Sequence, residues 1–152
     1  MRAWAIEHPH EYALVYGSPV AGYAAPQDTI GPASRVTLAL AAVVADAAAG
    51  SALHSPFTPQ GAPALSKRAA AEASRVGSIA LPEVPADAVV RALTAWTQLF
   101  GFVSFDLFGH LVGVIEDRDA LFDQSVTDMA AFIGIPSVPS RPRGATSTKA
   151  TH

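Results

Sequence analysis

The stretch from Ala88 to Ile115, AVVRALTAWTQLFGFVSFDLFGHLVGVI, constrains this chain more than any other segment. No proline interrupts it, and it is long enough for roughly seven helical turns at about 3.6 residues each. Apolar residues recur at three- and four-residue steps, and further apolar residues occupy the neighbouring faces. A helix that is apolar on both sides must be buried on both sides. The pattern therefore predicts a long central helix, covered on one side by the chain's own core and on the other by a second copy of the chain.

Composition narrows the class of protein. A length of 152 residues fits one domain, and a hydrophobic content of 50% is enough to build a core. The formal net charge of -3 argues against a nucleic-acid-binding surface, which is usually basic. The chain has no cysteine, which excludes disulfides, thiol catalysis and thiolate metal sites and agrees with a cytoplasmic location.

Targeting and membrane segments are not expected. The N-terminal residues MRAWAIEHPHEYALVYG lack the continuous apolar core of a signal peptide. The long helix is the membrane-spanning candidate, but it carries Arg91, Gln98, Asp106 and His110 around its circumference. Placing an arginine or aspartate near a bilayer centre costs about 2.5–3.5 kcal/mol each. We therefore expect a buried helix in a protein without membrane contact.

No segment alternates in the manner of a strand, so we expect an all-α fold, an antiparallel helical bundle spanning residues 1–135. Proline, glycine and capping residues predict the boundaries of its helices. A break at His8–Pro9 precedes a short helix that ends at Gly17. Two further helices are expected over Pro32–Gly50 and over Pro63–Val76, the second ending at Gly77. The long helix is expected to begin at Pro85, and the last helix to run from Asp117 to Gly134. Residues 136–152 have no apolar periodicity and are predicted to form a disordered, mildly basic tail.

Three blocks resemble one known family. AIEHPHEYALVYGSPVAGY (5–23) resembles the start of the effector domain of TetR-type transcriptional regulators, in which a His-Pro break leads into a short helix bearing a tyrosine. ALTAWTQLFGFVSFDLFG (92–109) resembles the long dimerisation helix of the subgroup with a Trp-Thr-Gln-Leu-Phe-Gly signature. DRDALFDQSVTDMAAFIGI (117–135) resembles the last helix of that domain. The blocks occur in the family's order.

The resemblance implies a homodimer in which the last two helices of each chain form a four-helix bundle. It also implies a small, largely apolar effector bound among the helices, with no cofactor and no catalysis. Nothing in these residues corresponds to the family's N-terminal helix-turn-helix domain. We therefore expect no direct DNA binding by this chain alone, because no recognition helix or basic face is present to enter a groove.

Polar residues inside the long helix suggest a ligand site. A buried carboxylate must be paired or neutralised, and Asp106 could pair with His110 four residues later. This face is either the solvated edge of the helix or a polar anchor in a pocket, and the sequence leaves both open. Ligand pockets in bundles are mostly apolar and aromatic with a few polar groups. The candidate pocket residues are Trp4, Tyr12, Tyr16, Trp96, Gln98, Phe100 and Asp106.

Apolar stripes on the two last helices supply candidates for the dimer interface. They are Leu93, Phe100, Ser104, Leu107, Phe122, Val126, Met129 and Ile133. Periodicity does not determine which stripe of the long helix faces the partner. A symmetric two-fold dimer is the default arrangement.

Motifs for metal binding or catalysis are weak or absent in this sequence. The run Glu7-His8-Pro9-His10-Glu11 resembles a metal site, but on a helix the two imidazoles diverge by about 200° and no distant cluster completes the site. No G-x-S-x-G motif or phosphate-binding glycine loop is present, so we assign no metal and no catalytic residue. The alternatives are a helical dimerisation module without a ligand, or a small helical-bundle enzyme using Asp106, His110 and the His8/His10 pair.

Overall fold

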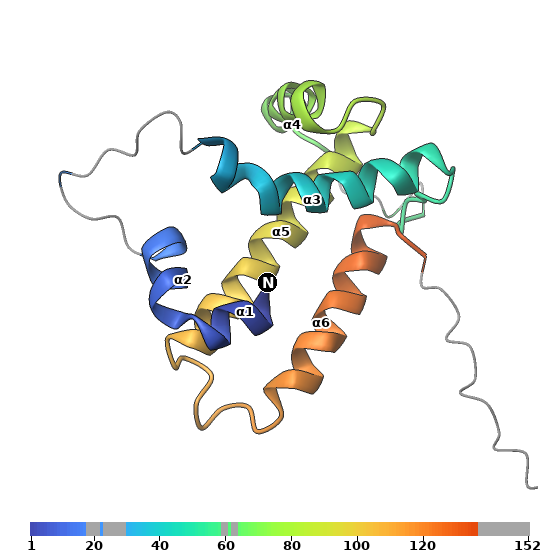
Figure 1. Cartoon of the computed structure of the whole chain (residues 1–152). Coiled ribbons are helices and arrows are strands. Elements are labelled where there is room, and N and C mark those ends of the chain that lie inside the picture. The colour runs from blue at the N-terminus through green and yellow to red at the C-terminus, as the bar shows by residue number, and fades with distance from the viewer. Residues whose placement is uncertain (18–21, 23–29, 59–60, 62–63, 137–152) are drawn as a thin grey trace, which may run out of the picture.

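The computed structural model describes residues 1–17, 22, 30–58, 61 and 64–136, and within these ranges every regular element is a helix. Helix α5 lies at the centre, α6 returns antiparallel beside it, and α1 and α2 pack at its C-terminal end (Figure 1). The all-α prediction with a long central helix is confirmed. The elements are α1 (Arg2–Glu7), α2 (Pro9–Tyr16), α3 (Ile30–Ala49), α4 (Lys67–Ala80), α5 (Ala86–Leu107) and α6 (Arg118–Ile133).

Several predicted boundaries are confirmed by local geometry. His8 separates α1 from α2 with φ -129° and ψ 59°, and Pro9 occupies the first turn of α2, where its missing N–H leaves no bond unmade. The Asp117 carboxylate accepts a hydrogen bond of 2.9 Å from the Ala120 backbone N–H and so caps α6. Gly134 ends α6 in the left-handed region with φ +105°.

The central helix is shorter than the sequence predicted. It ends at Leu107 rather than Ile115, and the chain then turns through Gly109 and Gly113, whose φ values are +81° and +75°. Both values favour glycine, because a Cβ is disfavoured there. The apolar residues Val112 and Val114, which lie in the segment predicted as helix, are 69% and 75% exposed. The prediction of helix over residues 108–115 was therefore wrong.

Helix α4 also differs from its prediction. It spans Lys67–Ala80, with the Ser66 side chain as its N-cap, and Gly77 lies buried inside it instead of ending it. A Cβ at Gly77 would lie 3.6 Å from Cγ2 of Val89 on α5. Ala73 and Gly77 allow α4 to approach α5 closely, so this helix contributes to the core despite its polar outer face. Pro63, the predicted start, lies outside the described residues.

The remaining boundaries need small adjustments. Helix α3 begins at Ile30, two residues before the predicted Pro32, and ends at Ala49 next to Gly50. The predicted disordered tail lies outside the described residues from position 137 onward, as does most of the loop between α2 and α3.

Two hydrophobic clusters lie along α5. The larger surrounds its N-terminal half and consists of Val44, Ala73, Leu81, Val89, Ala92, Ala95 and Ile133. The smaller joins its C-terminal half to α1 and α2 through Ala5, Tyr12 and Val103. Because both clusters draw on α5, this helix positions the rest of the fold.

Helix α5 is long and apolar enough to cross a membrane by length and composition, a test that a core helix also passes. Its Arg91 side chain is 8% exposed and donates to the Asp87 carboxylate at 2.7 Å and to the Ile133 carbonyl at 3.2 Å. The hydrogen bond from Arg91 holds the pKa of Asp87 below its ordinary value, against the opposing effect of partial burial. A charged residue with dedicated partners inside the bundle fits a core helix.

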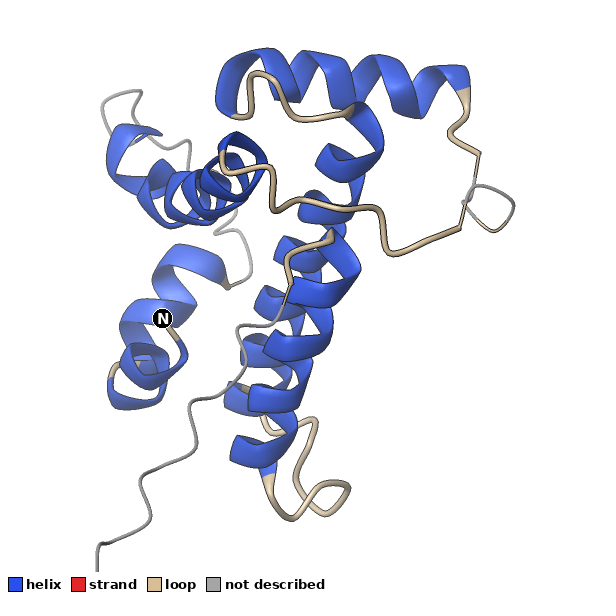
Figure 2. Cartoon of the chain, turned by 90° about the vertical axis from the view of Figure 1, so that its right-hand side faces the viewer, coloured by secondary structure: helices blue, strands red, loops and turns tan. Residues whose placement is uncertain are grey.

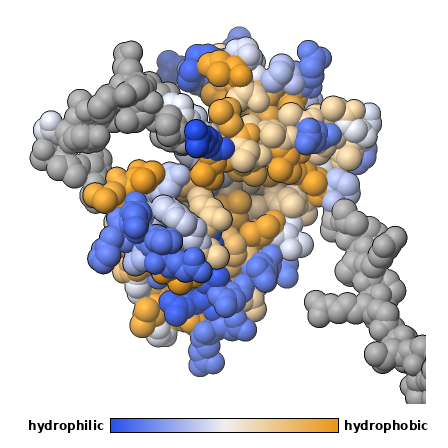
Figure 3. Space-filling model, in the orientation of Figure 1, coloured by the Kyte–Doolittle hydropathy of each residue, from blue (hydrophilic) through white to orange (hydrophobic). Residues whose placement is uncertain are grey.

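Apolar surface is distributed unevenly. Apolar side chains gather where α3 and α4 cross α5, whereas polar side chains cover much of the end formed by α1 and the α5–α6 connection (Figure 3). Figure 2 shows α1, α2 and α3 on one side of the α5–α6 pair, and no described helix covers the lower part of the opposite side. The two sides of this pair therefore have different environments within one chain.

Candidate functional site: an apolar cavity beside a charged cleft

An apolar cavity of about 210 Å³ lies between four helices. Helix α3 contributes two aliphatic side chains, α5 contributes one leucine and two aromatic rings, and α6 contributes a phenylalanine. Met1 and Arg2 cover the cavity from the start of α1. Its walls are Met1, Arg2, Val36, Leu40, Trp96, Leu99, Phe100 and Phe122.

The cavity continues into smaller and larger hollows. On the side of α1 and α2 it adjoins a hollow of about 370 Å³, with which it shares Met1 and Val36. Met1 and Trp4 in the wall of that hollow are 42% and 40% exposed, so it leads toward the surface. On the other side a narrow void of about 50 Å³ separates α3 from α4 and α5, and it shares Leu40 and Trp96 with the cavity.

Aromatic rings form a continuous row from the cavity to α2. The ring of Trp96 lies 5.4 Å from that of Phe100, which meets Tyr16 edge-on at 5.0 Å, and Tyr16 lies 5.0 Å from Tyr12. Such tilted and edge-on pairs are the favoured aromatic geometries. The Trp96 Nε1 atom is buried and has no hydrogen-bond partner among the described residues. With less than 1 Å² of accessible surface, this nitrogen lies behind the cavity wall and is not exposed to the cavity.

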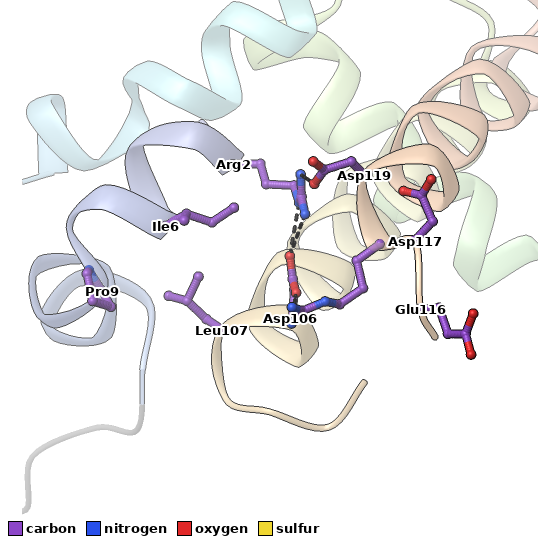
Figure 4. Close-up of a pocket in the computed structure, with 9 residues that line it drawn as sticks. Arg2, Ile6, Pro9, Asp106, Leu107, Glu116, Asp117 and Asp119 are labelled. Atoms are coloured by element: carbon purple, nitrogen blue, oxygen red, sulfur yellow. Dashed lines mark hydrogen bonds and ion pairs between the residues drawn. The ribbon is translucent and has the colours of Figure 1, made fainter. Parts of the chain in front are cut away.

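A charged cleft of about 510 Å³ lies next to the apolar cavity (Figure 4). Arg2 reaches from α1 to Asp106 near the end of α5, with bonds of 3.0 and 2.8 Å, and to Asp119 on α6 at 2.7 Å. Arg118 holds the second oxygen of Asp106 at 3.0 Å. This four-residue ion network joins the first helix of the chain to both helices of the α5–α6 pair.

Arg2 belongs to both the cleft and the cavity. Its guanidinium lies 5.1 Å from the centre of the Phe122 ring, which is itself part of the cavity wall. Partial burial works to lower the pKa of Arg2, but the bonds to Asp119 and Asp106 outweigh it and raise that pKa above the ordinary value. The side chain is therefore a fixed cation held between two carboxylates and an aromatic face.

The structure separates the seven predicted pocket residues, and the five aromatic ones lie close to the cavity. Trp96 and Phe100 line the apolar cavity, and Trp4 and Tyr16 line the adjoining hollow. Tyr12 is fully buried behind them, and its hydroxyl bonds the Ser104 hydroxyl at 2.8 Å.

The two polar candidates lie elsewhere. Gln98 is exposed and lines a groove of about 350 Å³ on the α5–α6 pair, while Asp106 lies in the charged cleft. The Asp106 side chain is 5% exposed, so it is not on a solvated edge of the helix. That any of the seven residues binds a ligand remains a prediction.

The suggested Asp106–His110 pair is not formed. Helix α5 ends before His110, so the two residues no longer share a helical face, and Asp106 is held instead by Arg2 and Arg118. The His110 ring packs at 5.0 Å against Phe105. Within the described residues no group of three or more His, Cys, Asp or Glu could hold a metal ion.

Most of the predicted dimer-interface residues have contacts within the chain. On α5, Phe100 lines the cavity, Ser104 bonds Tyr12, and Leu93 and Leu107 pack against the two core clusters. On α6, Phe122 lines the cavity and Met129 and Ile133 belong to the larger cluster or pack on it; Val126 is 41% exposed. The stripe through Leu93, Phe100 and Leu107 therefore faces the chain's own core, which periodicity left undecided.

Sequence reasoning missed part of the cavity wall. It did not propose Met1, Arg2, Val36, Leu40 or Leu99, and it placed Phe122 at the interface. The four-residue spacing of Val36 and Leu40 marks one face of α3, but not what that face covers. For Arg2 the available signal was the carboxylate of Asp106, which needed a cationic partner if buried.

Comparison with known proteins identifies the class. The family model described as tetracyclin repressor-like, C-terminal domain, matches residues 1–129. This chain belongs to that family of TetR-type transcriptional regulators.

Particular relatives agree with this assignment. The chain is 30% identical over 137 residues to HTH-type transcriptional regulator Rv1816 of Mycobacterium tuberculosis and to HTH-type transcriptional regulator Mb1846 of Mycobacterium bovis, with 88% of this chain covered. It spans about half the length (56%) of these curated relatives. The crystal structure of regulatory protein SCO4313 superposes with a TM-score of 0.55 and 29% identity, covering 86% of this chain and 56% of that one.

Proposed function

We propose that this chain is the effector-sensing and dimerisation part of a TetR-type regulator. The observation that carries the proposal is the apolar cavity between α1, α3, α5 and α6, walled by Trp96, Phe100 and Phe122. A mostly apolar cavity with a few polar groups between helices is the usual form of a small-molecule site. No chemistry is required of these residues, and a cytoplasmic location suits a transcriptional regulator.

The ion network offers a route from the cavity to the rest of a regulator. Arg2 touches the Phe122 ring in the cavity wall and binds Asp106 and Asp119 on α5 and α6. A ligand that displaces Phe122 would therefore change how α1 sits on the α5–α6 pair. Such a ligand shifts the population only if it binds one arrangement more tightly than the other.

The uncovered side of the α5–α6 pair is the proposed dimer face. Its groove is lined by Gln98, Gly101, Phe102, Phe105, Leu111, Ile115, Leu121 and Ser125. Phe105 and Leu121 are 54% and 39% exposed within one chain, and regulators of this family typically act as dimers. A second copy seated here would cover apolar side chains that the chain's own helices leave bare.

Solution mass tests the dimer. Light scattering over a range of protein concentrations should give twice the mass of one chain, and F105R should give a folded monomer because it places a charge in the apolar groove. The matched control is L38R on α3, where an equally exposed leucine (50%) lies away from this face. A wild-type monomer, or a dimer that L38R disrupts and F105R does not, would contradict the proposed face.

Ligand binding distinguishes the proposed sensor from the alternative function, a dimerisation module without a ligand. Small neutral aromatic compounds should raise the unfolding temperature of the wild-type chain, since binding to the folded state stabilises it. V36W, which adds bulk at the wall shared by the cavity and its adjoining hollow, should abolish that increase. If no compound raises the unfolding temperature, or if V36W responds like the wild type, the module without a ligand is the better description.

DNA binding by this chain alone is not proposed, given its net charge of -3.

A further inference from the structure

The hollow that adjoins the apolar cavity has a positive charge at its edge. Its described lining residues are Met1, Trp4, Tyr16, Arg35, Val36 and Ala39. Of their side chains only that of Arg35 is charged. Arg35 is exposed, and within the described part of the chain its guanidinium has no hydrogen-bond or ion-pair partner. This cation is therefore available to a molecule that enters the hollow.

No acidic side chain balances the charge at this edge. Neither aspartate nor glutamate is among the described residues that line the hollow or the cavity. The other cation, Arg2 in the cavity wall, is already bound by Asp106 and Asp119. A positively charged ligand group would therefore meet an unpaired like charge at the edge, whereas an anionic group would gain a partner there.

One face of α3 connects this charge to the apolar cavity. Val36 lines both spaces, Arg35 lines the hollow but not the cavity, and Leu40 lines the cavity but not the hollow. Arg35 and Leu40 are five residues apart, which is about 7.5 Å along the helix axis. A molecule that extends over this length has its polar end at the exposed edge and its other end among the rings of the cavity wall.

We infer that the effector is an amphipathic carboxylic acid, whose carboxylate pairs with Arg35 at the edge of the hollow and whose apolar tail extends into the cavity beside Trp96 and Phe100. The inference rests on the proposed sensor function and adds the ligand class and the residue that selects it. Arginine matches a carboxylate with two parallel hydrogen bonds. Because Arg35 is exposed, water still reaches the carboxylate, and the cost of burying a charge is avoided. The tail gains by leaving water for apolar walls.

Probes that differ in one end group test the charge. Phenylhexanoate, phenylhexanol and phenylhexylamine share an aromatic ring and an apolar chain. By calorimetry the acid should bind about twofold to fivefold more tightly than the alcohol, the range for one ion pair at an exposed position, and the amine should bind most weakly. Phenylacetate should have no advantage over phenylethanol, because its carboxylate cannot reach Arg35 while its ring lies in the cavity.

Variants at position 35 assign the preference to this arginine. R35Q should bind the acid and the alcohol equally, and R35E should reverse the order so that the amine binds more tightly than the acid. R68Q is the matched control, because Arg68 is also an exposed arginine but lies on α4, outside the cavity and the hollow. It should retain the wild-type order.

Tryptophan fluorescence reports the direction in which the probe lies. The chain has two tryptophans, Trp4 in the wall of the hollow and Trp96 in that of the cavity. Phenylhexanoate with bromine on its ring quenches a tryptophan that it touches. It should quench Trp96, measured in W4F, more strongly than Trp4, measured in W96F.

The outcomes distinguish this inference from the sensor function on which it rests. A preference for the acid that R68Q retains, R35Q loses and R35E reverses supports the inference, as does stronger quenching of Trp96. The reversal in R35E is a gain of binding, which misfolding cannot produce. Binding of the acid no tighter than that of the alcohol, an acid preference that survives in R35Q, or stronger quenching of Trp4 overturns the inference and leaves the sensor function intact. Absence of binding by every probe overturns the sensor function itself.

Discussion

Asp106 offers the sharpest test of how the fold is held together. Its carboxylate accepts two hydrogen bonds from Arg2 and one from Arg118, and its side chain is 5% exposed. In D106N the charge is lost and an amide N–H₂ group is placed opposite guanidinium donors. Breaking a buried ion pair by changing one partner costs about 3–5 kcal/mol.

The environment of the two arginines reduces the loss of unfolding free energy expected for D106N. Arg2 keeps its bond to Asp119, and the Arg118 side chain is 41% exposed, so water can replace part of what Arg118 loses. We therefore expect D106N to lose about 2–3 kcal/mol of unfolding free energy. For a domain of this size that corresponds to a fall in Tm of about 4–12 °C.

D119N is the matched control, because Asp119 binds the same arginine from an 84% exposed position. It should lose less than about 1 kcal/mol, and added salt should remove most of that loss. The assay is urea unfolding followed by circular dichroism at one fixed protein concentration, since dimerisation makes stability depend on concentration. A D106N loss no larger than that of D119N would refute the reasoning that burial decides the strength of this network.

Three further predictions follow from single contacts. Y12F removes a fully buried hydroxyl that bonds Ser104, and it should lower the free energy of unfolding in urea by about 0.5–1.5 kcal/mol. Adding S104A to Y12F should cost little more, because the bond is already lost. A second loss as large as the first would argue against the bond. The pKa of Asp87 is lowered in the folded state, so its contribution to stability is present above its ordinary pKa and is lost as pH falls through the lowered value. D87N should therefore lose less stability than the wild type on acidification. Parallel profiles of unfolding free energy against pH in the two proteins would exclude this effect. G134A should destabilise by more than about 1 kcal/mol, because φ is +105° and a Cβ would overlap a backbone carbonyl. The control is G31A in α3, where a Cβ meets nothing within 4 Å; it should be neutral or stabilising. Similar thermal shifts in the two variants would contradict the difference.

The sequence determined the elements of this fold where the signal is local. Pro9, Asp117 and Gly134 act through their own backbone or through a neighbour a few residues away, so the break before α2 and both ends of α6 could be predicted. The same reasoning failed at Gly77, because a glycine ends a helix or permits close helix packing depending on what lies opposite. The presence of Val89 beside it is not a local property.

The tertiary structure decided which faces meet and which stay bare. Two apolar stripes on α5 could each face the core, and only the packing of α1, α2 and α3 assigned the one with Phe100 to the interior. The sequence indicated that Asp106 needs a partner if buried, but residues within hydrogen-bonding range in the fold lie as far as 104 positions apart in the chain. The periodicity of a helix fixes the angle between its own side chains, whereas the contacts of each face depend on where the other helices dock.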